Sequence, residues 1–305
     1  IGYPLLLAEI AMGRKTGKAA VETFSQVHPK FKFAGVFETI VPFLLLCFYC
    51  VLGGIVIKYM ISNLGDILGL HFGMNHTNSA DFFGFFVSDP RAVLLYTVIF
   101  LAMTSYVVFR GIENGIEKFC AIGMPLLFGM LIITVIKCCT LPHAAEGIKF
   151  MFKPDFSIFA GTGWFKVFAM AGGQMFFSLS LASGALVAYG SYMKKDADLE
   201  QNAMLVPVLD TFAALLAGLA VFPAVFSENL APSGGPGLLF VSLQTVFNSM
   251  GKVGPIFGFI FYTLVFVAAF SSSIGMMEGG ISAIMDYRIK KNKTANRPLV
   301  VLGIT

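Results

Sequence analysis

Long apolar runs are the feature that most limits what this chain can fold into. Segments of about 20 apolar residues, each long enough to cross a lipid bilayer, recur along its whole length. The chain is 57% hydrophobic and 12% charged, with a mean hydropathy of +0.81. A soluble domain is roughly half apolar and a quarter charged, and the alternating segments of a β-barrel are missing from the sequence. The sequence therefore predicts an all-α, polytopic transmembrane helical bundle.

The apolar runs predict the helices of a single transmembrane domain over residues 1–305. Its first residue is Ile1, and both ends of the chain lie inside apolar runs, so we expect an incomplete domain that is truncated at both ends. The expected spans are about 1–13, 37–70, 91–109, 118–141, 163–193, 202–226, 254–286 and 297–305, with a short amphipathic outer-loop helix at about 236–250.

Positive charge alternates between successive loops and predicts the orientation. Fourteen of the 21 Lys and Arg residues fall in the loops at 14–32, 110–118, 194–195 and 288–297, whereas the loops between these hold four. The positive-inside rule places the basic set in the cytoplasm. The net charge of +4 is therefore explained by membrane topology, and the lipid bilayer is the expected partner. The charge does not indicate nucleic-acid binding. The short loops favour a multi-pass protein of a bacterial inner membrane.

Three acidic residues lie at membrane depth, where an ionisable side chain is costly and is a functional candidate. They are Glu9 in LLLAEIAMGR, Asp210 in VPVLDTFAALLAG and Glu278 in SSSIGMMEGGISA. For Glu9 and Glu278, a structural role in helix–helix hydrogen bonds and a functional role are equally good interpretations. Asp210 favours function because it shares a depth with two clusters of hydroxyl groups.

The hydroxyl clusters are Ser178, Ser180 and Ser183 in one apolar segment and 271–273 in another. Hydroxyl and carbonyl oxygens suit small hard cations, and a helix broken at mid-membrane adds free backbone groups that must line a cavity. We expect a site for a small cation and a polar ligand between the 163–193 and 254–286 segments. Chemistry alone does not select Na⁺.

Enzyme chemistry has no support in the sequence. The five cysteines all lie in apolar segments, the four histidines are scattered, and neither a nucleophile elbow nor a phosphate-binding glycine loop is present. A channel would need a continuous polar path, whereas the polar groups here cluster at one depth. The sequence therefore supports neither an enzyme nor a channel.

Six stretches along the chain carry distinctive motifs. They are, in order, GYPLLLAEIAMGR, RGIENGIEKFCAIGMPLLF, GQMFFSLSLASGALVAYGSYMKKD, DTFAALLAGLAVFPAVF, GGPGLLFVSLQTVF and AAFSSSIGMMEGGISAIMDY. In this order and spacing they resemble the neurotransmitter:sodium symporter family. The resemblance implies the leucine-transporter fold, with inverted repeats and broken helices, from the second to the start of the ninth transmembrane helix. It also implies that the 163–193 helix is broken near 178–182.

Two sodium sites follow from the resemblance, each incomplete in this chain. Ser178 and Asp210 resemble ligands of the first site, where the family usually has an asparagine at the second of these positions. The carbonyl of Ala268 with Ser271 and Ser272 resembles half of the second site. A fixed carboxylate at Asp210 can offset sodium charge in place of a mobile anion, so we expect that chloride is not required.

The resemblance also implies a substrate pocket and a cytoplasmic gate. Tyr49 matches the tyrosine that holds the substrate carboxylate, and Tyr192 and Asp286 match parts of the gate. The other expected substrate contacts are Leu45, Phe177, Ser178, Ser180, Ser183, Ser272 and Met276, with Phe177 also the aromatic lid.

The implied function is sodium-coupled symport of an amino acid by alternating access, for the parent protein. Two departures from the family pattern affect the pocket: Ala182 replaces a usual glycine, and Ser183 is small where relatives can carry a large residue. The methyl group of Ala182 makes the local backbone less free, while Ser183 enlarges the pocket. With the adaptable wall at Met276, the enlarged pocket favours a bulky hydrophobic or aromatic substrate. The alternative is a non-transporting, truncated or regulatory product of a symporter gene. The oligomeric state is not predicted.

Overall fold

Five helices are long and apolar enough to cross a membrane in the computed structural model, which describes residues 1–74, 77–159, 161, 163–228, 235–291 and 296–303. The described residues form helices and turns and contain no strand. The five are α3 Lys32–Leu68, α5 Pro90–Phe109, α6 Lys118–Cys139, α10 Leu199–Ser227 and α12 Gly254–Lys290.

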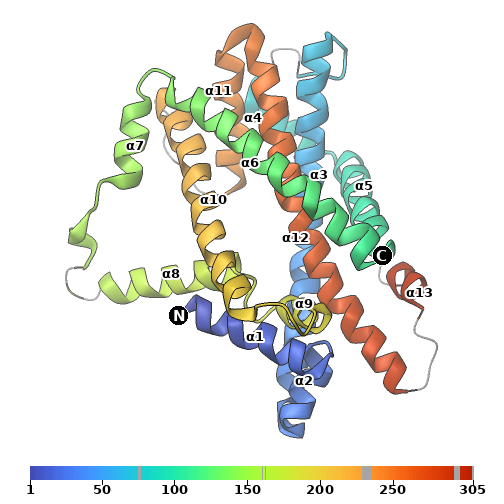
Figure 1. Cartoon of the computed structure of the whole chain (residues 1–305). Helices are drawn as coiled ribbons and strands as arrows, with labels where there is room; N and C mark the ends of the chain where they lie inside the picture. The colour runs from blue at the N-terminus through green and yellow to red at the C-terminus, as the bar shows by residue number, and fades with distance from the viewer. Residues whose placement is uncertain (75–76, 160, 162, 229–234, 292–295, 304–305) are drawn as a thin grey trace.

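Shorter helices complete the described chain (Figure 1). They are α1 Gly2–Thr16, α2 Ala20–Val27, α4 Ser79–Ser88, α7 Ala144–Phe152, α8 Gly163–Ser178, α9 Ala185–Tyr192, α11 Leu243–Ser249 and α13 Arg297–Leu302. Five short non-α turns are η1 Pro29–Phe31, η2 Ile112–Glu117, η3 Phe156–Phe159, η4 Leu238–Ser242 and η5 Gly251–Val253.

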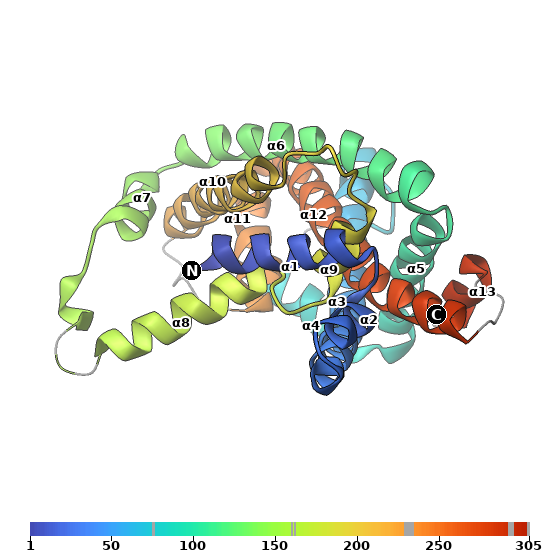
Figure 2. The ribbon, with the colours of Figure 1, turned by 60° about the horizontal axis from the view of Figure 1, so that its bottom comes forward.

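The two longest helices, α3 and α12, pack along each other through the middle of the molecule. Small residues let them approach closely: an added Cβ at Gly280 would collide with the ring of Phe43, and one at Gly258 would collide with the amide of Asn63. Around this pair, α5 and α6 pack on α12, and α10 packs on α6. Figure 2 shows α1 and α9 side by side across another face of the bundle.

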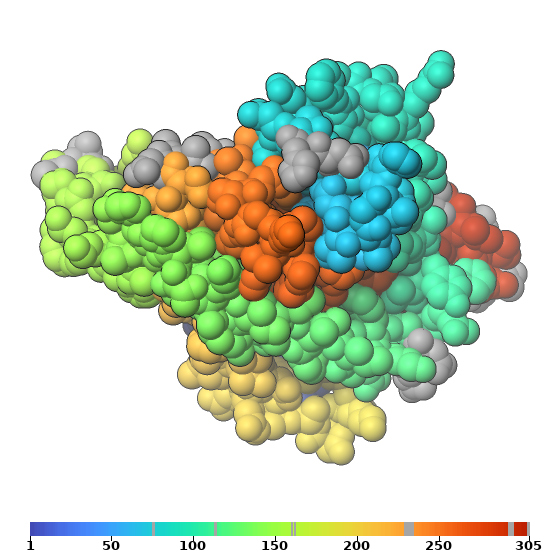
Figure 3. Space-filling view, turned by 90° about the horizontal axis from the view of Figure 1, so that it is seen from above, coloured from blue at the N-terminus to red at the C-terminus, as the bar shows by residue number. Residues whose placement is uncertain are grey.

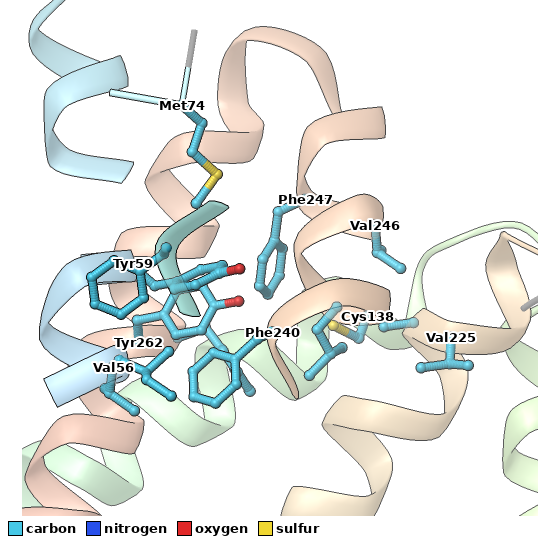
Figure 4. Packing of buried hydrophobic residues seen from close by; sticks show 14 residues of the cluster. Val56, Tyr59, Met74, Cys138, Val225, Phe240, Val246, Phe247 and Tyr262 are labelled. Atoms are coloured by element: carbon cyan, nitrogen blue, oxygen red, sulfur yellow. The ribbon is translucent and has the colours of Figure 1, made fainter. Parts of the chain in front are cut away.

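Aromatic packing fixes the end of the bundle where α3 finishes (Figure 4). The rings of Tyr59 and Tyr262 are fully buried with centroids 5.0 Å apart, and Phe240 and Phe247 pack against them. The Tyr262 hydroxyl donates to the carbonyl of Leu239 at 3.0 Å. Seen from above, the end of α3 and the segment holding α11 lie next to each other (Figure 3). The outer-loop segment is thereby anchored to both long helices.

The structure differs from the expected spans chiefly where short helices replace loops. Helices α2, α4 and α7 lie in stretches that we expected to be loops, and α3 begins at Lys32 instead of near residue 37. At eight to ten residues, these helices are too short to give a membrane-length apolar run. Helix α4 has a local cap: the side chain of Asn78 accepts from the backbone N–H of Ala80 at its start.

Candidate functional site

The segment from 163 to 193 is two helices joined by an unwound stretch. Helix α8 ends at Ser178 and α9 begins at Ala185, which leaves residues 179–184 outside regular helix. Ser180, Ala182 and Gly184 have φ values of 54°, 56° and 67°. Non-glycine residues adopt this left-handed conformation uncommonly, and strained backbone of this kind clusters at functional sites. We call residues 179–184 the break.

Side chains hold the break in place. The Ser183 hydroxyl donates to the carbonyl of Ser180 at 2.6 Å, and the backbone N–H of Ala182 donates to Glu9 Oε1 of α1 at 2.9 Å. The first contact is local to the break, and the second joins the break to α1. The break is therefore a supported conformation, and its residues 179–183 line a cavity.

The cavity has a volume of about 740 Å³ and is bordered by α3, α8, the break, α9, α10 and α12. Its lining includes every residue that the sequence assigned to the substrate: Leu45, Tyr49, Phe177, Ser178, Ser180, Ser183, Ser272 and Met276. The structure thus brings residues from three separate segments, α3, 163–193 and α12, to one place. Phe177, the expected lid, is 62% exposed.

Ser178 and Asp210 meet at the end of α8. The Ser178 hydroxyl lies 2.8 Å from both carboxylate oxygens of Asp210, which is half-buried and lines the cavity. A hydroxyl, a carboxylate and the carbonyl groups of an unwound helix end form a set of oxygen ligands that suits a small hard cation.

The serine run of α12 divides between two environments. The hydroxyls of Ser271 and Ser272 both donate to the carbonyl of Ala268, at 2.9 and 3.1 Å, so three oxygens lie close together. Ser271 and Ser272 line the cavity. Ser273 is fully buried away from it and lies 3.0 Å from the Thr104 hydroxyl of α5, so its role is in helix packing.

The two expected gate residues have different partners. The Tyr192 hydroxyl donates to Glu278 at 2.7 Å, and Glu278, with no exposed surface, also pairs with Arg297 of α13. Asp286 instead accepts from the backbone N–H of Ala19 at 2.6 Å and lies 3.6 Å from the ammonium group of Lys18. Glu278 is therefore a buried ion-pair partner that joins α9, α12 and α13.

Sequence reasoning missed several residues around the cavity. Gln174 and Tyr189 line it, as does Phe48, which precedes the expected carboxylate-binding tyrosine. The signal for Tyr189 was its spacing, because it lies four residues after Ala185 and so faces the same side of α9. Glu38, an acid inside the long apolar helix α3, was also overlooked.

Comparisons with known proteins agree with one another. The model of the "Sodium:neurotransmitter symporter family" matches residues 86–305. The "Uncharacterized sodium-dependent transporter YhdH" of Bacillus subtilis is 34% identical over 96% of this chain and 64% of its own length. A Haemophilus influenzae protein with the description "Uncharacterized sodium-dependent transporter" is 33% identical over 94% of this chain and 64% of its own length. This chain thus spans 64% of the length of both relatives.

A solved structure supports the same fold. The crystal structure of MhsT in complex with L-phenylalanine superposes with a TM-score of 0.87, at 37% sequence identity, and covers 100% of this chain and 67% of that one.

Proposed function

Because the chain belongs to the sodium:neurotransmitter symporter family, we propose that it forms the ion- and substrate-binding part of a sodium-coupled amino-acid symporter. The observation that carries the proposal is the supported break in the α8–α9 segment, which borders a cavity lined with oxygen ligands. Family membership and the apolar helices make it a multi-pass membrane protein related to transporters and not to enzymes. We place it in a bacterial inner membrane.

Sodium is the cotransported ion in this proposal, and the residues present suit it. Ser178 and Asp210 supply a hydroxyl and a negative charge for one ion. The Ala268 carbonyl, with the Ser271 and Ser272 hydroxyls, supplies neutral oxygens for a second. Hard oxygen ligands without nitrogen or sulfur favour ions of this type. Each group would supply part of a sodium site in this proposal.

The substrate is an amino acid with a bulky apolar side chain in this proposal. Tyr49 contacts the carboxylate and Ser180 lies near the amine, while Leu45 and Met276 form an apolar wall. Ser183 supports this assignment because its hydroxyl is already bonded to the Ser180 carbonyl, so the residue adds space without offering the substrate a free donor. MhsT, which shares the fold, was solved with L-phenylalanine.

Sodium binding and substrate binding are coupled in this proposal because both ligands occupy the same cavity. Sodium bound at Ser178 and Asp210 would lie beside the substrate carboxylate, so each ligand raises the affinity of the other by the same factor. Alternating access would then rock α1 and α9 against the α3–α12 pair around a fixed central site. Tyr192 and Asp286 lie at the cytoplasmic end of this path by the positive-inside assignment.

Binding of a panel of labelled amino acids to the complete protein tests this function. We expect saturable binding of Leu, Trp, Tyr or Phe that requires sodium and disappears when potassium or choline replaces it, because the oxygen ligands are matched to sodium. Equilibrium binding to purified protein measures it. Binding that is independent of sodium contradicts the function, and displacement of label by Gly or Ala more readily than by Leu, Trp or Tyr contradicts the apolar substrate class.

Transport is expected to continue without chloride. Asp210 places a fixed negative charge where the first sodium would bind, so a mobile anion is not needed to offset the ion in a medium of low dielectric. Sodium-driven uptake into proteoliposomes, with gluconate substituted for chloride on both sides, should stay within about twofold of the chloride value. Uptake that falls with chloride removal and returns on its readdition contradicts this expectation.

A further inference from the structure

Some of the polar side chains that line the cavity are already bonded within the chain, and others are not. Those with partners are Ser178, Asp210, Ser183, Ser271 and Ser272. The polar side chains of the lining that have no hydrogen-bond partner among the described residues are those of Tyr49, Gln174, Ser180 and Tyr189. The proposed function uses Tyr49 and Ser180, so the amide of Gln174 and the hydroxyl of Tyr189 have no role in it.

Tyr189 is the one of these two groups that is built into the cavity wall. Gln174 is exposed on α8, whereas Tyr189 is half-buried on α9. Helical side chains lean toward the N-terminus of their own helix, so the Tyr189 ring is directed back toward the break. Its hydroxyl oxygen lies 3.3 Å from the position that a Cβ on Gly275 of α12 would occupy. The hydroxyl therefore reaches across the cavity wall to α12.

The register of α9 on α12 gives the level at which this hydroxyl lies. A Cβ on Gly279 would lie 3.2 Å from the backbone nitrogen of Ala185, the first residue of α9. Gly275 lies one helical turn before Gly279, and Gly275 lines the cavity. The Tyr189 hydroxyl therefore lies beyond the start of α9, although its backbone is one turn inside that helix.

At this level, the neighbours of the hydroxyl on α12 are residues of the proposed substrate pocket. Gly275 precedes Met276 directly, and it follows Ser272 by three residues, which places these two on one face of the helix. The Ser272 hydroxyl already donates to the Ala268 carbonyl. Tyr189 therefore offers this part of the pocket an uncommitted hydroxyl, which can both donate and accept a hydrogen bond.

We propose that Tyr189 determines substrate specificity: its hydroxyl hydrogen-bonds the polar tip of an aromatic side chain, so tyrosine and tryptophan are favoured over phenylalanine and leucine. The proposal rests on the proposed function and narrows its substrate class. A phenolic O–H can donate to or accept from Tyr189, and an indole N–H can donate to it. Phenylalanine or leucine would fill the same space but leave the Tyr189 hydroxyl unpaired beside an apolar ligand, which costs affinity.

Equilibrium competition binding of tyrosine, tryptophan, phenylalanine and leucine to the complete protein in sodium tests the proposal. We expect tyrosine and tryptophan to bind the wild type about three- to tenfold more tightly than phenylalanine, as one net hydrogen bond implies. In Tyr189→Phe, this advantage should disappear, while the affinities for phenylalanine and leucine stay within about twofold. Tyr106→Phe is the matched control, because Tyr106 is an exposed ring of α5 outside the cavity; it should keep the wild-type ratios.

The ratio of tyrosine to phenylalanine affinity separates contact with the substrate from a structural role. A structural role of the Tyr189 hydroxyl would weaken all four amino acids alike in Tyr189→Phe, and that result overturns the proposal. A wild-type ratio that is retained in Tyr189→Phe also overturns it, while sodium-dependent binding leaves the proposed function intact. If no amino acid binds the wild type in sodium, the proposed function fails and the specificity proposal fails with it.

Gly275→Ala tests the same contact from the side of α12. The added methyl group would lie 3.3 Å from the Tyr189 hydroxyl oxygen, which is closer than ordinary van der Waals contact, so the hydroxyl must shift. We expect Gly275→Ala to reduce the preference for tyrosine over phenylalanine, and to leave the ratio unchanged when it is added to Tyr189→Phe. A change in the ratio that is equal with and without the Tyr189 hydroxyl overturns the proposal.

Discussion

Replacement of Asp210 by alanine is expected to raise the sodium concentration needed for half-maximal amino-acid binding by at least about a hundredfold. This is a loss of about 2.7 kcal/mol of sodium-binding free energy. Asp210 is the only charged residue among the described residues that line the cavity, and both of its carboxylate oxygens lie 2.8 Å from the Ser178 hydroxyl. Two opposite charges 4 Å apart attract by about 4 kcal/mol at an effective dielectric constant near 20. Loss of the carboxylate therefore removes the main electrostatic attraction for the first ion.

The measurement is the sodium concentration that gives half-maximal binding of a labelled amino acid. Asp210→Asn separates charge from geometry, because its amide oxygen can still accept from Ser178 but carries no charge; we expect an intermediate loss of sodium affinity. Asp196→Ala, in an exposed turn, is the matched control and should behave as wild type. Wild-type sodium dependence in Asp210→Ala would show that this carboxylate does not contribute to the ion site.

Local sequence was sufficient to predict the membrane helices, whereas the break was expected from the family resemblance. The long apolar runs determine helix type because a chain in lipid must satisfy its backbone hydrogen bonds within each segment. Ser178, Ser180 and Ser183, close together within one such run, indicated a functional site, and the resemblance implied that the helix is unwound near 178–182. The structure has left-handed residues at Ser180 and Ala182.

The tertiary contacts of the site residues were harder to predict, because they depend on how distant helices rotate and pack against one another. Ser272 and Ser273 are adjacent in sequence, yet one lines the cavity and the other is fully buried against α5. A rotation of about 100° per residue separates them on the helix surface. The sequence identified Glu278 as an acid at membrane depth. Its ion pair with Arg297 joins α12 to α13, and nothing in the sequence indicated this partner. Such pairings depend on tertiary packing.

Replacement of Gly190 by valine is expected to destabilise the protein by about 2–3 kcal/mol, as overpacking of a dense interface does. Helices α1 and α9 pack backbone to backbone: an added Cβ at Gly190 would overlap the carbonyl of Ile10, and one at Gly13 would overlap the carbonyl of Val187. Backbone atoms cannot rotate away as a flexible side chain can, so the helices must separate. Gly13→Val should therefore have the same effect from the opposite side of the interface.

Separation of α1 from α9 should also change the geometry of the cavity. Helix α1 supplies Glu9 to the break, and α9 begins directly after the break. We therefore expect Gly190→Val to lower the thermal midpoint in detergent and to weaken amino-acid binding together. Gly129→Val is the matched control: it lies on an exposed face of α6, and an added Cβ there meets no atom within 4 Å. Equal thermal midpoints for Gly190→Val and Gly129→Val would contradict close packing of α1 on α9. A lower midpoint with unchanged binding would show that the break is positioned without this interface.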